Sequence, residues 1–393
     1  MADRILVVVQ RYGDVAGGAE TLARELVQRL RPHVAAIDVA TTTARDYWTW
    51  KNEFTAGEDR VDGVTVHRFP VVAGRARDFR RYEHAAFKKD HTLADERAFI
   101  RAQGPTAPAL LEFVHRRGPT YTGVVFFTYI YAPTVHGVPL VPERAIVVPT
   151  AHDEPALALA AYRPVFHAPR ALSFSTVEER DMVHRTFGNE RVPHDVIGIG
   201  IDVPAGSDPD RFRRAHGITG PYFLYLGRIV ASKGCPELFD HWARFAAQHN
   251  GPATLVLAGH REMAVPDRPD VRYIGTVSET DKFDALAGCT ALVYSGRLDS
   301  LSIITLEAWA MGRPAVVSAK APVLASMTRR AGAGLPYGSA AEFAELLELL
   351  LERPALAAAL GAAGRAFVER TYTWPGVVQK YLDLFAEVRA RNS

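Results

Sequence analysis

Short runs of apolar residues recur along the chain without the polar alternation of a half-buried strand. Examples are Ile5–Val9, Val124–Phe127, Ala145–Val148, Leu224–Leu226, Leu255–Ala258, Ala291–Tyr294 and Ala315–Val317. Strands that are apolar on both faces belong in parallel sheets covered by helices on each side. Amphipathic segments with the residue spacing of a helix lie between the runs. Examples are Leu22, Leu26 and Leu30, and Phe343, Leu346, Leu347 and Leu350. The pattern predicts a doubly wound α/β fold.

The runs form two sets, from Arg4 to about Ile199 and from Tyr222 to about Pro336. Between them, Gly198–Pro209 is rich in Gly, Pro and Asp, which is typical of a linker or hinge. We therefore predict two Rossmann-like domains over residues 1–200 and 201–370, facing one another across a cleft where ligands bind. Residues 371–393 have helical spacing and are expected to form a C-terminal helix that crosses back to the first domain.

Composition excludes several classes of protein. With 46 Lys and Arg against 44 Asp and Glu among 393 residues, the net charge of +2 gives no sign of nucleic-acid binding. Cys235 and Cys289 are too few for a disulfide framework or a four-thiolate zinc site, and indicate buried thiols in a reducing compartment. The Ile5–Val9 run is too short for a signal peptide, and no run approaches the roughly 18 apolar residues of a membrane span. A cytoplasmic protein is expected.

A glycine-rich loop, Gly13–Glu20, directly follows the first run and opens a helix. Glycines at such a place let backbone N–H groups approach an anion, and the helix amino terminus adds positive partial charge. The loop matches neither the dinucleotide fingerprint nor the phosphate-binding P-loop. A tight turn that needs positive φ is the alternative interpretation.

Two cations follow the first strand of the second domain, Arg228 and Lys233 in the segment Leu226–Gly234. An Arg can bind phosphate oxygens in a bidentate manner and a Lys acts as a mobile point charge, so the pair suits a diphosphate. If a glycosidic bond to that diphosphate breaks, cations aimed at the leaving group stabilise the transition state. The alternative is a solvated loop.

Two acids occur in the segment Asp299–Pro314, with a helix expected from about Ser302 to Gly312. Asp299 lies in the loop before this helix and Glu307 lies within it. One carboxylate could accept hydrogen bonds from both hydroxyls of a ribose while the other faces the cleft. Alternatively, Asp299 caps the loop and Glu307 pairs with a neighbouring cation.

Taken together, these motifs resemble the retaining, nucleotide-sugar-dependent glycosyltransferases of family 4, which have the GT-B fold. The resemblance covers nearly the whole chain and rests on Gly227–Gly234, on the acid pair Asp299–Glu307 and on Trp374–Val378. It implies that residues 1–200 bind the acceptor and residues 201–370 the nucleotide sugar. It also implies that no metal or other cofactor is needed, since cations and helix termini neutralise the leaving group.

The resemblance assigns roles to individual residues. Arg228 and Lys233 would bind the donor diphosphate, Glu307 the ribose, and Asp299 would lie beside the donor sugar. The catalytic set is therefore Arg228, Lys233, Asp299 and His152, and the donor-binding set is Gly17, Gly18, Gly227, Ser300, Leu301, Ser302 and Glu307. The family usually has Glu in place of Asp299 and an aromatic-glycine pair in place of Leu301-Ser302. The shorter side chain withdraws the carboxylate by about 1.5 Å.

His152 follows the apolar run Ala145–Val148 and would point into the cleft, where a family His contacts the donor sugar. The adjacent Asp153 and Glu154 raise the rival of an inverting enzyme with a carboxylate base, and a structural His-Asp pair is a further alternative. Arg45–Glu53 is an aromatic and polar loop that would face carbohydrate or form a surface lid. The basic segment Arg75–Arg101 would contact the inner face of an anionic membrane, receive a lipid-diphosphate acceptor, or form a solvated amphipathic helix.

We predict an enzyme that transfers a hexose from a UDP-sugar or GDP-sugar to a hydroxyl acceptor with retention. The acceptor would be a saccharide, a lipid-linked saccharide or a small molecule, in the synthesis of a cell-surface polysaccharide, a glycolipid or a glycosylated metabolite. Two rivals stay open: a nucleotide-sugar epimerase or hydrolase, and a non-catalytic nucleotide-sugar-binding subunit.

Overall fold

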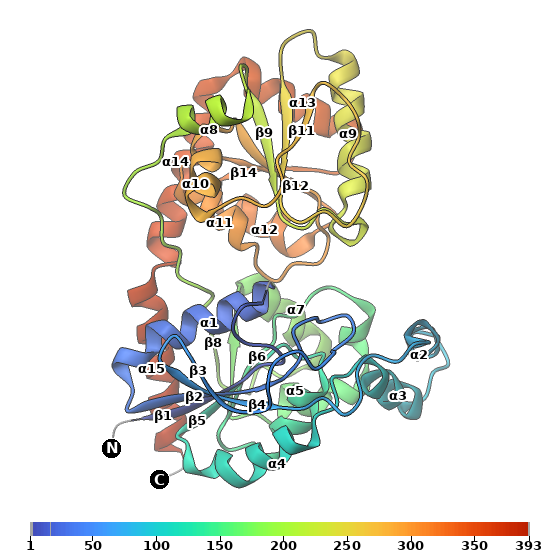
Figure 1. Ribbon diagram of the computed structural model, residues 1–393, viewed down its shortest axis with the longest axis vertical. Coiled ribbons are helices and arrows are strands. Elements are labelled where there is room, and N and C mark those ends of the chain that lie inside the picture. The colour runs from blue at the N-terminus through green and yellow to red at the C-terminus, as the bar shows by residue number, and fades with distance from the viewer. Residues whose placement is uncertain (1–2, 16, 392–393) are drawn as a thin grey trace. The chain divides into compact units, whose positions relative to one another are not determined.

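The computed structural model describes residues 3–15 and 17–391, which form two compact units. The first unit comprises Met1–Ile199 and Pro375–Ser393, and the second comprises Gly200–Trp374. Each unit has one largely parallel sheet between layers of helices (Figure 1). The predicted two-domain α/β class is confirmed. Ala16, within the glycine-rich loop, lies outside the described residues.

The first unit contains an eight-stranded sheet in the order β3-β4-β2-β1-β5-β6-β7-β8. Its strands are β1 (Arg4–Val8), β2 (Ala36–Thr42), β3 (Gly57–Val61), β4 (Val64–Phe69), β5 (Gly123–Phe127), β6 (Ala145–Val148), β7 (Ala171–Phe174) and β8 (His194–Val196). All neighbours are parallel except β3, which pairs antiparallel with β4 at the edge. The central strands β1, β5 and β6 are the predicted apolar runs, because helices bury both of their faces.

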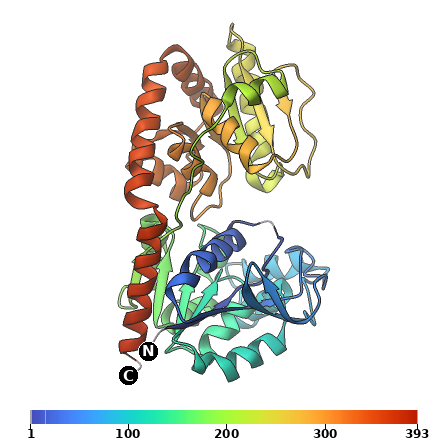
Figure 2. The same cartoon turned by 60° about the vertical axis from the view of Figure 1, so that its left-hand side comes forward.

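The helices of this unit are α1 (Gly18–Leu30), α2 (Phe79–Ala86), α3 (Leu93–Gln103), α4 (Pro108–Arg117), α5 (Ala132–Gly137), α6 (Arg163–His167), α7 (Val177–Phe187) and, from Pro375 on, α15 (Trp374–Ala390). The last helix packs along the β7 and β8 end of the sheet (Figure 2). Ser173 Oγ donates to Tyr381 Oη at 3.0 Å, and Lys380 Nζ donates to the Val196 carbonyl at 2.5 Å. These bonds attach the C-terminal segment to the first unit.

The second unit contains a six-stranded sheet in the order β11-β10-β9-β12-β13-β14. Its strands are β9 (Tyr222–Leu226), β10 (Thr254–Ala258), β11 (Val271–Tyr273), β12 (Ala291–Tyr294), β13 (Ala315–Ser318) and β14 (Gly334–Tyr337), and every pair is parallel. This strand order is that of a dinucleotide-binding Rossmann fold, in which the direction of winding reverses between the two central strands. Here the reversal falls between β9 and β12.

The helices of this unit are α8 (Pro209–His216), α9 (Cys235–Gln248), α10 (Glu279–Gly288), α11 (Ile303–Ala310), α12 (Pro322–Ala331), α13 (Ala340–Glu352) and α14 (Pro354–Thr371). Trp242 of α9 and Phe343 of α13 belong to one buried core with Phe223 and Val293 of the sheet. In the predicted linker Gly198–Pro209, residues 198–208 contain no helix or strand, and Pro209 is the first residue of α8. In the described part of the chain, no helix is long and apolar enough to cross a membrane.

Candidate active site

The carboxyl ends of β9 and β12 are the place in the second unit where a ligand is expected. In an open parallel sheet, the loops that follow the two strands at the winding reversal diverge and leave a crevice between them. The loop after β9 carries Arg228 and Lys233, and the loop after β12 carries Asp299. The fold therefore positions three of the predicted catalytic residues at one edge of one sheet.

Lys233, Tyr294 and Asp299 form a hydrogen-bonded cluster at this edge. Lys233 Nζ lies 3.2 Å from Asp299 Oδ1 and 3.1 Å from Tyr294 Oη, and Tyr294 Oη donates to Asp299 Oδ2 at 2.8 Å. Burial, reinforced by the charge of Asp299, raises the pKa of Tyr294 well above its usual value. The phenol therefore stays protonated and acts as a donor to the carboxylate. The Asp299 carboxylate thus contacts two side chains and does not cap the backbone of its loop, which was the alternative interpretation.

Gly234 explains why Lys233 can reach this cluster. Its φ of 72° is left-handed, and an added Cβ would lie only 2.3 Å from the Ser295 carbonyl oxygen. Ser295 Oγ in turn donates to the Lys233 carbonyl at 3.0 Å. The loops after β9 and β12 thus touch through their backbones, which only a residue without a side chain allows.

A second close approach shapes the segment around Arg228. A Cβ on Gly259, at φ 134°, would lie 2.0 Å from the Gly227 carbonyl oxygen, so the loops after β9 and β10 also touch. Beyond the strand ends, Ile229 N still donates to the His260 carbonyl at 2.8 Å. Gly259 therefore has a packing reason for being glycine, and Gly227 has a conformational one, because its own φ is 146°.

Arg228 is held at both its backbone and its side chain. Tyr225 Oη donates to the Arg228 carbonyl at 2.8 Å, and the Tyr225 ring stacks with Tyr294 at 6.4 Å between centroids. Arg228 Nη1 forms an ion pair with Glu262 Oε1 at 3.3 Å, with both side chains about one-third exposed. Through the two tyrosines, the Arg228 segment is connected to the Lys233–Asp299 pair. The partially exposed guanidinium faces solvent enough to meet a ligand.

Glu307, on α11, pairs with Lys282 of α10. Their Oε1 and Nζ atoms are 2.7 Å apart, and both side chains are largely buried. Burial alone would lower the pKa of Lys282, but Glu307 and Glu279 outweigh it and raise that pKa. Burial also raises the pKa of Glu307, against the opposing charge of Lys282. The alternative in which Glu307 pairs with a neighbouring cation thus describes the structure, and the ribose contact stays a prediction.

The residues before α11 are partly enclosed. Ser300 and Ser302 are buried and Leu301 is half-buried. Ser302 is the N-cap position, and its Oγ accepts from Thr305 Oγ1 at 2.8 Å instead of capping the helix backbone. Their predicted donor contacts remain predictions, because the described contacts are all within the protein.

In the first unit, the glycine-rich loop lies against a buried ion pair. Arg11 Nη2 and Glu20 Oε1 are 2.6 Å apart, with side chains at most one-tenth exposed. A Cβ on Gly17 would lie 2.0 Å from Glu20 Oε2, whereas one on Gly18 would meet nothing within 4 Å. Gly13 has φ 111°, as the tight-turn alternative requires. The pair Arg11–Glu20 therefore accounts for Gly17, while Gly18 has no such packing reason.

His152 is half-buried in the loop after β6, and its carbonyl accepts from Glu154 N at 2.9 Å. Asp153 is exposed, while Glu154 accepts a 2.9 Å hydrogen bond from Tyr129 Oη. Burial raises the pKa of Glu154. The neighbouring Ala151 N donates to Glu179 Oε1 at 2.6 Å, which ties this loop to α7. The catalytic role of His152 is a prediction that these contacts leave open.

The two weaker sequence candidates divide into structural and exposed parts. In Arg45–Glu53, Trp50 is buried and donates from Nε1 to the Gln103 carbonyl at 2.9 Å, whereas Trp48 is 57% exposed. Arg75–Arg101 forms α2 and α3 in place of the single helix considered above. A capping box between Thr92 and Asp95 begins α3 and so interrupts the segment.

Sequence reasoning missed Tyr294, Tyr225, Glu262 and Lys282. A signal existed for Tyr294, since it is a polar-tipped residue at the carboxyl end of an otherwise aliphatic strand. Lys282 gave none, because a lysine in an amphipathic helix is ordinary. Its pairing with Glu307 depends on how α10 and α11 pack.

Comparison with known proteins places the site in a family context. Residues 220–353 match the family described as Glycosyl transferases group 1. A GDP-mannose-dependent monoacylated α-(1-6)-phosphatidylinositol monomannoside mannosyltransferase of Corynebacterium glutamicum is 27% identical over 206 residues, 49% of this chain and 54% of that protein. An α-1,3/1,6-mannosyltransferase of Mus musculus is 26% identical over 172 residues, 38% of this chain and 41% of that protein. The matches thus span about half or less of each relative.

Solved structures agree over nearly the whole chain. Sucrose-phosphate synthase from Thermosynechococcus elongatus has a TM-score of 0.70 at 15% identity, covering 99% of this chain and 100% of that one. HepE of Anabaena, in complex with UDP and glucose, has a TM-score of 0.71 at 14% identity, covering 98% and 99%. At these identities the likeness shows the fold alone. The chain has the GT-B fold, and its residues 220–353 are similar to the family described as Glycosyl transferases group 1.

Proposed function

We propose that this chain is a retaining, metal-independent hexosyltransferase that uses a nucleoside diphosphate sugar and a hydroxyl acceptor. The observation that carries the proposal is the Lys233–Tyr294–Asp299 cluster at the carboxyl ends of β9 and β12, next to the Arg228 segment. A cation and a carboxylate held there by a shared phenol can face a diphosphate and a sugar at the same time.

In the proposed reaction, the bond between the anomeric carbon and the diphosphate oxygen breaks, and negative charge grows on the leaving group. Lys233 Nζ has three N–H donors, two of which are directed to Tyr294 and Asp299. The remaining N–H group of Lys233 and the Arg228 guanidinium stabilise the departing diphosphate more strongly than they stabilise the bound nucleotide sugar. The acceptor oxygen bonds to the same face of the carbon, and its proton passes to the leaving phosphate.

Glu307 would hold the ribose, and Asp299 would orient the sugar. Glu307 is suited to this because carboxylate oxygens can accept hydrogen bonds from both hydroxyls of a ribose, and the charge of Lys282 opposes the effect of burial on the pKa of Glu307. Gly17, Gly18 and His152 belong to the first unit, and their roles toward the donor stay predictions. The two relatives described above are mannosyltransferases by name, and one is GDP-mannose-dependent, which favours a mannosyl donor for this chain.

The experiment is a transfer assay with the full chain, using GDP-mannose, UDP-glucose and their nucleotides over a panel of saccharide, lipid-linked and small hydroxyl acceptors. We expect one donor to give a product whose anomeric configuration, read by NMR, equals that of the donor. The rate should be unchanged by EDTA. An inverted product, or a requirement for added metal, contradicts the corresponding part of the proposal. Donor consumed to free sugar or to an epimer, without acceptor product, contradicts transfer.

The proposal includes peripheral membrane contact through Arg75–Arg101. Seven cations of this segment are exposed, Arg77, Arg80, Arg81, Lys88, Lys89, Arg97 and Arg101, against two exposed acids, Asp78 and Asp90. Such a surface attracts anionic lipid through charge. Cosedimentation with vesicles containing anionic lipid should fall when Arg80 and Arg81 are replaced by Gln, and vesicles of neutral lipid should not bind. Equal binding to both vesicle types contradicts the charge-based contact.

A further inference from the structure

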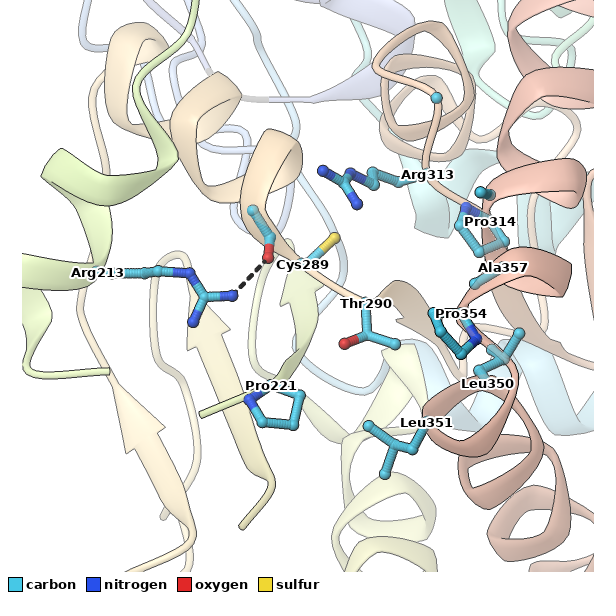
Figure 3. Close-up of a pocket in the computed structure, with 13 residues that line it drawn as sticks. Arg213, Pro221, Cys289, Thr290, Arg313, Pro314, Leu350, Leu351, Pro354 and Ala357 are labelled. Atoms are coloured by element: carbon cyan, nitrogen blue, oxygen red, sulfur yellow. Dashed lines mark hydrogen bonds between the residues drawn. The ribbon is translucent and has the colours of Figure 1, made fainter. Parts of the chain in front are cut away.

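A cavity of about 340 Å³ lies at the amino ends of β9, β12 and β13. Pro221, Thr290 and Pro314, each of which directly precedes one of these strands, line it (Figure 3). The Lys233–Asp299 pair lies at the carboxyl ends, so the length of the strands separates the two places. The volume is within the range of small-molecule pockets. Nothing in the proposed transfer reaction uses it.

Two arginines line the cavity with no carboxylate partner among the described residues. Arg213 donates to the Gly220 and Gly288 carbonyls at 2.7 and 3.0 Å, and Arg313 donates to the Ala287 carbonyl. Arg313 Nε is buried and has no hydrogen-bond partner. Each guanidinium has five N–H donors, so these carbonyls leave several unused. Neither guanidinium therefore forms an ion pair with an acid in the described part of the chain.

The positive charges of both guanidinium groups lower the pKa of the same two side chains, Cys289, which lines the cavity, and Tyr222. Burial raises the pKa of Cys289 to about 12, and the charges of Arg313 and Arg213 oppose that rise. Burial likewise raises the pKa of Tyr222, and again both arginines oppose it. Arg213 and Arg313 also donate to the carbonyls of two consecutive residues, Gly288 and Ala287, so the two cations lie on the same side of the cavity, where a single anion can meet both.

The wall opposite Arg213 is apolar. Leu350, Leu351 and Pro354 gather opposite Arg213, and Ala357 continues that wall (Figure 3). No acidic residue is among those that line the cavity. The first turn of α14 belongs to this wall, and a helix amino end adds positive partial charge. The cavity thus combines a cationic side with an apolar side.

We propose that this cavity binds a small phosphate monoester with an apolar body. The charge of nearly −2 on such a phosphate near neutral pH matches the two arginines, whose planar forks suit phosphate oxygens. The apolar body would lie against Leu350 and Leu351. This ligand is distinct from the donor, and the site is independent of the proposed transferase activity.

The test uses the full chain and phenyl phosphate as the probe, with binding measured by isothermal titration calorimetry at low ionic strength. Ala358 and Ala359 are both exposed on α14, but only Ala358 lines the cavity. Ala358→Trp should fill the cavity and raise the Kd about tenfold or more, while Ala359→Trp should bind as the unaltered chain does. Arg313→Gln should weaken binding by a similar factor, because it removes charged hydrogen bonds.

Two controls separate this site from other anion sites. Lys233→Ala should bind phenyl phosphate as the unaltered chain does, since Lys233 follows the carboxyl end of β9 and the cavity lies at the amino ends of the strands. Inorganic phosphate should bind more weakly than phenyl phosphate. The proposal is overturned by unchanged affinity in Ala358→Trp, by loss of binding in Lys233→Ala, by equal affinity for inorganic phosphate, or by no saturable binding at millimolar probe. The tryptophan pair keeps both arginines, so it tests the site even if Arg313→Gln fails to fold.

Discussion

Lys233 Nζ and Asp299 Oδ1 lie 3.2 Å apart although 66 positions separate them in the chain. The contact joins the two loops that diverge at the winding reversal of the second sheet. Asp299 is only 12% exposed and Lys233 is 30% exposed, so the pair lies partly out of water, where charges interact more strongly. An incoming diphosphate would share the lysine with this carboxylate. The pair therefore keeps the lysine near the site before any ligand arrives.

Lys233→Ala should lower the rate of transfer about 10²–10³-fold, because one donor to the developing negative charge is lost. The fold should persist, since the side chain is partly exposed. Steady-state kinetics with the best donor and acceptor measure the effect. Lys320→Ala is the control: Lys320 follows β13 and pairs with Glu237 at 2.6 Å, outside the cluster. Near-normal turnover in Lys233→Ala would mean that the diphosphate lies elsewhere.

Tyr294→Phe should lower kcat several-fold and reduce the free energy of unfolding by about 1 kcal/mol, the usual worth of a hydrogen bond. The change removes the hydroxyl that connects Lys233 and Asp299 but keeps the ring that stacks on Tyr225. Kinetics and urea denaturation measure the two effects. Tyr381→Phe, which loses a buried bond with Ser173 in the first unit, should lose similar stability and no activity. Equal activity losses in both variants would make the effect of Tyr294 a matter of stability alone.

Asp299→Glu, which introduces the residue usual in the resembled family, should lower kcat and not raise it. Both carboxylate oxygens of Asp299 already have partners, at 2.8 and 3.2 Å. One more methylene moves the carboxylate by about 1.5 Å and breaks this geometry. Transfer kinetics with a matched donor measure the change. A gain in kcat would show that the aspartate withdraws its carboxylate from the sugar, as the length argument alone suggests.

The sheets could be predicted from the sequence because their central strands are apolar on both faces. Ala291–Tyr294 is such a run and is β12. The edge strands escaped prediction for the opposite reason: Gly57–Val61 is mostly exposed and polar, since it pairs on one side only. Lys233 and Asp299 could be singled out by type and position. Their mutual contact could not, because it depends on the backbone approach of Gly234 to Ser295.

Gly17→Ala should lower the stability of the chain, whereas Gly18→Ala should lower its activity and leave its stability unchanged. The Cβ at position 17 would collide with Glu20 and disturb its buried pair with Arg11, so we expect a loss of about 1–3 kcal/mol. At position 18 nothing lies within 4 Å, and alanine suits the first turn of α1. Gly18→Ala should therefore keep its Tm yet lower transfer, if that backbone faces the phosphates as predicted. Thermal unfolding and kinetics on both variants decide this, and unaltered transfer in Gly18→Ala would remove Gly18 from the donor site.

Glu179 should make stability depend on pH near neutrality. It is fully buried at the start of α7, where it accepts from Ala151 N and Ser175 N, both at 2.6 Å. Burial, opposed by these bonds, raises its pKa from an ordinary value of 4.5 to about 7. Between these values the folded chain holds a proton that the unfolded chain has released. The free energy of unfolding therefore falls as pH rises through this window, by about 3 kcal/mol in all.

The measurement is urea denaturation of the full chain at several pH values from 4.5 to 8. Glu179→Gln should be less stable at low pH, because the amide cannot accept both backbone bonds, but its free energy of unfolding should vary less with pH. Glu178→Gln, at the neighbouring position, should keep the pH dependence of the unaltered chain. If the free energy of unfolding of Glu179→Gln varies with pH as much as that of the unaltered chain, another group titrates in this pH range and Glu179 is not responsible for the pH dependence.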